Sequence, residues 1–197
     1  MCALLDVPAF IDVDPETVPC KAGYLTAEDR GYRLEFKPGL NVGICWAAGK
    51  RELQPSVAET ARQKTLAFSQ FAPLARPGVN LVSLQQVHGD GAALRDLGVH
   101  DPMAGVTDFM DTAWIISQLD LVITTDTSVA HLAGALGKQV WSLVRFDAAW
   151  PWMRDTDRTC WYDSMTIYRQ AKPYDWQPVL TRLLADFEAL VGRKAVA

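Results

Sequence analysis

Short apolar segments alternate along this chain with segments that have helical spacing, and this alternation limits the possible folds more than any other feature. The apolar segments are uniformly apolar rather than polar at every second residue, which is typical of parallel strands buried on both faces. Four such strands are predicted, at residues 41–47, 79–84, 120–125 and 139–144. Helices are predicted at residues 65–74, 92–97, 111–119, 127–136 and 176–191. The pattern predicts an α/β, Rossmann-like fold, with a mainly parallel sheet of about five or six strands and helices on both faces.

The chain divides at about residue 40. Residues 1–40 contain Pro8, Pro15, Pro19 and Pro38 among short apolar pieces without a sustained period, so we expect an irregular arm or linker there. Residues 48–63 are interpreted as a polar loop. A total of 197 residues suits one domain, which we place at residues 41–197.

Composition excludes several classes of function. The net charge is −4 and the isoelectric point is about 5.3, so no broad basic surface is available for nucleic acid or a membrane surface. We find neither a signal peptide nor an apolar stretch long enough to span a membrane, and we expect a cytoplasmic protein. The four cysteines are scattered, so we expect neither a metal site nor a disulfide. They are Cys2, Cys20, Cys45 and Cys160.

Residues 119–137 form a predicted strand that leads through a polar turn into a predicted helix. Ligands of open parallel sheets bind at the carboxyl ends of strands, and a helix N-terminus there favours an anion such as a diphosphate. Thr127 and Ser128 supply hydroxyls at the turn, and His131 follows Thr127 by one helical turn. In a purely structural interpretation, Asp126 or Thr127 caps the helix and His131 is packed. Small residues at 130 and 133–135 favour the ligand site, because they let the helix lie close to the sheet.

From about residue 41 onward, the chain resembles the C-terminal half of bacterial GT-B glycosyltransferases related to the heptosyltransferases. The similarity is strongest to the tetratricopeptide-linked members, which also resemble O-linked N-acetylglucosamine transferases. The matching pieces are residues 42–46, 71–74, 82–85, 108–113, 119–137 and 150–170. The resemblance implies that this half binds a nucleotide-diphosphate sugar, while an N-terminal acceptor domain or a second chain supplies the acceptor site. It also implies inverting transfer without a metal or other cofactor.

The resemblance carries donor-site roles onto particular residues. Asp126, Thr127, Ser128 and His131 match the donor-phosphate motif, and Lys64 falls where such transferases place a cationic residue. In these roles Thr127 and Ser128 bind phosphate, Asp126 positions the turn, and His131 and Lys64 offset the charge of the leaving group. A solvated surface lysine is the alternative for Lys64.

Three more residues are candidate contacts to the nucleoside or the sugar. Gln85 ends a strand on the side of the crevice, and its amide can both donate and accept hydrogen bonds. Asp108 precedes a helix, as does Asp111, for which helix capping is an equally good explanation. Trp150 belongs to an aromatic loop whose tryptophans either stack on a ligand or anchor the loop to the core.

Two departures from the family pattern leave the activity open. The loop after the first strand is short at residues 47–55, and the acceptor domain, which supplies the catalytic base in this family, is almost wholly absent from the sequence. We therefore expect the chain to be inactive alone, and the catalytic residues stay unassigned. The alternatives are a catalytically silent nucleotide-binding or assembly module and, with a poorer motif match, a GT-B-type epimerase.

Overall fold

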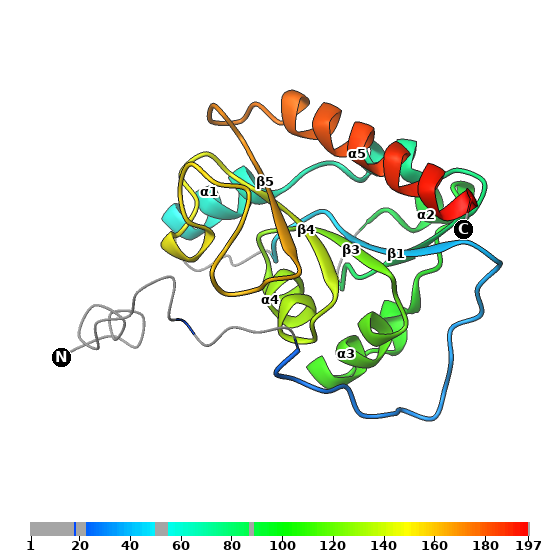
Figure 1. Ribbon diagram of the computed structural model, residues 1–197. Coiled ribbons are helices and arrows are strands. Elements are labelled where there is room, and N and C mark those ends of the chain that lie inside the picture. The colour runs from blue at the N-terminus through cyan, green and yellow to red at the C-terminus, as the bar shows by residue number, and fades with distance from the viewer. Residues whose placement is uncertain (1–17, 19–22, 50–54, 87–88, 197) are drawn as a thin grey trace.

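The computed structural model describes residues 18, 23–49, 55–86 and 89–196, and within them a parallel sheet is covered by helices on both faces (Figure 1). Its five strands lie in the order β2-β1-β3-β4-β5. They are β1 (Leu40–Cys45), β2 (Val79–Ser83), β3 (Leu121–Thr125), β4 (Gln139–Val144) and β5 (Met165–Arg169). The α-helices are α1 (Pro55–Lys64), α2 (Gly91–Asp96), α3 (Phe109–Ser117), α4 (Ser128–Ala135) and α5 (Gln177–Val196). Short 3₁₀ helices are η2 (Phe68–Leu74), η3 (Pro102–Gly105) and η4 (Trp150–Trp152). The predicted Rossmann-like α/β fold is confirmed.

Alternate strand residues supply two separate hydrophobic cores, because successive side chains of a strand point to opposite faces. On one face, Ile44, Ile123 and Leu143 pack with η2 and α5, while Val122 and Val140 pack on the other with α3 and α4. Figure 1 shows α5 on one side of the sheet, with α3 and α4 on the other. Both faces of the central strands are therefore buried, as their apolar sequences predicted.

Gly43 in β1 has a packing role that no other residue can fill without displacement. A Cβ atom at this position would lie 2.6 Å from Cδ1 of Leu119 and 2.6 Å from Cδ1 of Leu84. Because glycine has no side chain, Leu84, which follows β2, and Leu119, which follows α3, can pack directly on β1. Gln85 immediately follows Leu84 in the chain.

Three predicted elements need correction. The interval 48–63, interpreted as a loop, contains most of α1, whose sequence has few apolar residues to mark a helical period but begins with proline, which suits the first helical position. The helix predicted at residues 65–74 is the 3₁₀ helix η2, which contains Pro73 and therefore lacks one backbone donor. Strand β5 was not predicted, because the loop before it is also rich in aromatic residues and no clear change in composition marks the start of the strand.

The described part of the N-terminal arm, residues 23–39, contains neither helix nor strand and packs along α3. Arg30 forms ion pairs with Asp108 at 2.8 Å and with Asp111 at 3.0 Å. The backbone carbonyl of Tyr32 accepts a hydrogen bond from the Trp114 indole N–H at 2.7 Å. The arm thus stabilises the start of α3.

Helix α5 packs on one face of the sheet, against β5 and η2. Leu183 and Phe187 are buried in the same core as Trp141 and Tyr168, and the Tyr168 hydroxyl donates to Asp186 at 2.8 Å. Over the residues that the structure describes, no helix combines the length and apolar character needed to cross a bilayer.

Candidate functional site

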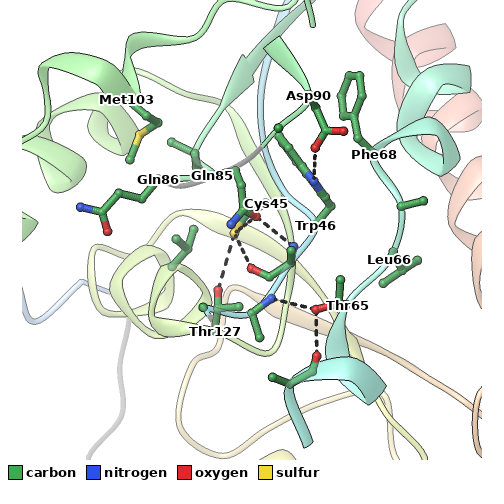
Figure 2. Close-up of a pocket in the computed structure, with 18 of the residues that line it drawn as sticks. Cys45, Trp46, Thr65, Leu66, Phe68, Gln85, Gln86, Asp90, Met103 and Thr127 are labelled. Atoms are coloured by element: carbon green, nitrogen blue, oxygen red, sulfur yellow. Dashed lines mark hydrogen bonds between the residues drawn. The ribbon is translucent and has the colours of Figure 1, made fainter. Parts of the chain in front are cut away.

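A large cavity, of about 1390 Å³, opens at the carboxyl ends of β1, β2 and β3 (Figure 2). In the strand order β2-β1-β3, the chain passes from β1 to β2 on one side and then to β3 on the other side of β1, so the cavity lies at the topological switch point where ligands of open α/β sheets bind. Cys45 at the end of β1, Gln85 after β2, and Thr127 and Ser128 after β3 all line it. The volume exceeds what most drug-sized ligands need, and is ample for a nucleotide sugar.

One wall of the cavity is apolar and aromatic, and its residues were not predicted from the sequence as site residues. Trp46 lies against Phe68 with ring centroids 5.0 Å apart, and its indole N–H donates to Asp90 at 3.2 Å. Other lining residues of this wall are Leu66, Met103 and Phe109. Leu66 lies between α1 and η2, Met103 lies in η3 and Phe109 begins α3, so only the tertiary fold brings them together. Such a wall can pack against a flat heterocycle.

The N-terminus of α4 faces the cavity without a side-chain cap. Thr127 is the N-cap residue, but its hydroxyl lies 3.3 Å from that of Thr124 and 3.9 Å from the Cys45 sulfur instead of capping the helix. Ser128 is exposed at the first helical position. The Ala130 N–H already donates to the Thr127 carbonyl at 3.0 Å, so an anion here would be bound by the backbone N–H groups of Ser128 and Val129, and the helix dipole favours one there.

Asp126 and Lys64 form an ion pair beside this helix start. The Lys64 ammonium lies 2.6 Å from the Asp126 carboxylate, and the two side chains are 21% and 7% exposed. Neither residue lines the cavity, although Arg62 and Thr65 of the same chain segment do. The lysine is thus held against the turn between β3 and α4 rather than directed freely into the cavity.

His131 lies on α4 outside the cavity lining, with one side of its ring covered by aromatic residues. The ring stacks on Trp152 with centroids 4.9 Å apart and an interplanar angle of 27°, and Nδ1 lies 3.1 Å from the Tyr162 hydroxyl. Tyr162 in turn packs on Gly134, where a Cβ would come within 2.6 Å of its ring. Gly134 thus makes room for Tyr162, whereas Ala130 and Ala133 are fully buried in the core with the sheet, as predicted.

Burial is the main cause that lowers the pKa of His131 below its ordinary value of 6.5; Lys64 also lowers this pKa, and Asp126 acts in the opposite direction. At His131 the unfolded chain therefore binds more protons than the folded one just below pH 6.5, so the contribution of His131 to the free energy of unfolding should rise with pH up to about 6.5 and level off above it. We expect the thermal stability advantage of the wild type over H131Q to shrink as the pH falls from about 7 to about 5. Melting curves of both proteins over this range test this. A constant difference in melting temperature would contradict the expectation.

The remaining candidate contacts separate into two groups. Gln85 lines the cavity, whereas Asp108 and Trp150 do not. Asp108 caps α3 by accepting the Asp111 N–H and also binds Arg30, and these contacts, the cap first, lower its pKa. Trp150 is 49% exposed and contacts Trp161 edge to face at 5.5 Å. The capping interpretation therefore describes both Asp108 and Asp111, and Trp150 belongs to the surface of the loop before β5.

Cys45 and Cys160 are free thiols, and burial raises the pKa of each. Cys2 and Cys20 lie outside the described residues. In the described ranges, no three or more His, Cys, Asp or Glu side chains are grouped so that they could hold a metal ion.

Comparisons with known proteins define the class of fold. No family model matches the chain. Protein FlbA of Caulobacter vibrioides is 30% identical over 195 residues, which covers 92% of this chain and 30% of FlbA. The structure of the E. coli ADP-heptose LPS heptosyltransferase II superimposes with a TM-score of 0.55 at 16% sequence identity, over 81% of this chain and 49% of that one. The chain thus shares the α/β, Rossmann-like fold of part of heptosyltransferase II, and it spans less than a third of FlbA and about half of heptosyltransferase II.

Proposed function

We propose that this chain binds a nucleotide-diphosphate sugar in the cavity at the carboxyl edge of the sheet, as the donor half of an inverting, metal-independent glycosyltransferase. The observation that carries the proposal is the uncapped N-terminus of α4, which opens onto a cavity of about 1390 Å³ at the switch point of the sheet. The heptosyltransferase-like fold supports the same assignment.

In this proposal the two ends of the cavity bind different parts of the ligand. The diphosphate accepts hydrogen bonds from the first turn of α4 and from the hydroxyls of Thr127 and Ser128, which line the cavity. The nucleoside packs on the apolar wall around Trp46. Asp126 fixes the turn through Lys64, and Lys64 and His131 offset the charge of the departing diphosphate from beside the cavity.

A catalytically silent nucleotide-binding or assembly module is the second candidate, and the charge distribution favours it. The Lys64 ammonium is already paired with a carboxylate, and the residues that line the cavity include Arg62 together with the acidic Asp90 and Asp96. Such a lining suits modest binding better than stabilisation of a leaving diphosphate. The two candidates share the ligand site and differ in turnover.

Ligand binding at α4 can be tested with a substitution that should not harm folding. We expect the wild-type chain to bind ADP with a dissociation constant of about 1 mM, or about 4 kcal/mol. S128E should abolish this binding because it places a carboxylate where the diphosphate belongs, while the helix dipole tolerates an acidic residue in a first turn. Titration followed by NMR measures both affinities.

The matched control is Q177E, which adds the same single negative charge at the exposed first residue of α5, outside the cavity. It should bind ADP like the wild type. Equal ADP affinity in S128E and Q177E would remove α4 from the proposed site.

A further inference from the structure

Gln85 is a buried residue of the cavity whose side-chain oxygen has two defined hydrogen-bond partners. It is only 6% exposed, and its Oε1 accepts the backbone N–H of Ala47 at 2.9 Å and the thiol of Cys45 at 3.4 Å. Because Oε1 faces a backbone N–H, the orientation of the carboxamide is fixed. Its Nε2 must then point the other way, and no residue that the structure describes accepts a hydrogen bond from it.

The fixed carboxamide lies beside the start of α4. The Cys45 sulfur contacts Gln85 Oε1 on one side and the Thr127 hydroxyl at 3.9 Å on the other, as Figure 2 shows. Gln85 therefore belongs to the end of the cavity that holds the uncapped helix N-terminus. Gln85 and the first residues of α4, Ser128 and Val129, line the same cavity.

We propose that Gln85 is a specificity-determining residue that donates a hydrogen bond from Nε2 to a phosphate oxygen of the ligand. This inference rests on the proposed function, because it names a contact within the same site. A phosphate oxygen only accepts hydrogen bonds, and the locked amide can offer the ligand only a donor, so the two are complementary. The sequence alone left both roles of the amide open, and the loop N–H of Ala47 removes one of them.

The test compares Q85M and Q85E with the wild type, using pyrophosphate, adenosine and ADP as probes in NMR titrations. Q85M removes the donor without adding charge, and we expect binding of pyrophosphate and ADP to weaken about tenfold. Q85E keeps an acceptor for Ala47 but presents a negative oxygen to the ligand, so its loss should be larger. Adenosine binding should be unchanged in both.

Q170E is the matched control for a buried charge. Gln170 is also a buried glutamine whose Oε1 accepts a loop N–H, that of Phe146 at 3.2 Å, but it lies after β5 outside the cavity lining. Thermal melts of all variants check folding. If Q85M and Q85E do not fold, the side-chain NH₂ signals of Gln85 in the wild type decide: they should shift with pyrophosphate and stay still with adenosine.

The outcomes separate this inference from the proposed function. If the wild type binds ADP and the Gln85 variants bind it equally well, or if the Gln85 signals stay still at saturating pyrophosphate, the inference is wrong and the donor site stands. If the wild type binds adenosine but neither ADP nor pyrophosphate, the inference is also wrong. Absence of binding by all three probes would overturn the proposed function and the inference together.

Discussion

Replacement of Trp152 by alanine should lower the free energy of unfolding by about 3–5 kcal/mol, the usual cost of removing a large buried aromatic side chain. Trp152 is 1% exposed and packs in the core formed with α3 and α4, although it belongs to the short helix η4. The same substitution removes the ring on which His131 stacks at 4.9 Å. Water then reaches the covered face of the imidazole as well, so the pKa of His131 should move back up toward 6.5.

Urea unfolding measures the first effect, and the pH dependence of the His131 ring signals in NMR measures the second. Trp150 offers a matched control, since it lies two positions away in the same short helix but is 49% exposed. We expect W150A to cost less than about 1 kcal/mol and to leave the pKa of His131 where it is. A pKa for His131 that is equal in the wild type and W152A would show that the tryptophan does not set its environment.

The sheet could be predicted from sequence because its central strands are buried on both faces and therefore uniformly apolar. Residues 121–125 illustrate this, since every residue of β3 is buried. Helix α1 could not be predicted in the same way. Its sequence from Pro55 to Lys64 carries few apolar residues, so its helical form depends on local propensity and tertiary contacts rather than on a periodic apolar face.

The candidate site could be predicted only in part, because the sequence reveals neither the direction of a side chain nor contacts between residues far apart in the chain. Thr127 and Ser128 lie at a strand end, and strand ends meet at one edge of a parallel sheet, so sequence places them at the cavity. The direction of the His131 ring depends on Trp152 and Tyr162, which no helical spacing reveals. Asp108 binds Arg30, 78 residues earlier, so its engagement was not visible in the local motif.

The locked orientation of Gln85 is a further case in which the residue was identified but its chemistry was not. Its position at the end of β2 indicated a ligand contact, whereas its role as a donor depends on the N–H of Ala47, 38 residues away. Only the parallel pairing of β1 and β2 brings these two strand ends together.

Glycosyl transfer by the 197-residue chain alone should be undetectable, even though we expect it to bind the donor. Inverting transfer needs a base that removes the proton of the acceptor hydroxyl, and it needs water to be kept from the activated sugar. Asp90 and Asp96 are the carboxylates that line the cavity, and Asp90 already accepts a hydrogen bond from the Trp46 indole. The chain matches only 49% of heptosyltransferase II, so the other half of that protein has no counterpart in this comparison. Holding the acceptor in position beside the donor can by itself raise the rate as much as an acceptor concentration on the order of 10⁵ M would.

The measurement uses an ADP-activated sugar and follows both transfer and hydrolysis, with the chain alone and with the polypeptide encoded immediately upstream added or joined. If the chain is the donor half of an enzyme, we expect no detectable turnover from the chain alone. When the acceptor domain is supplied, the rate of transfer should increase at least about 10³-fold. A silent module should bind ADP in both settings and turn over in neither. Robust transfer by the chain alone would show that its own residues supply the base, and Asp90 and Asp96, as the carboxylates that line the cavity, would then be the first to replace.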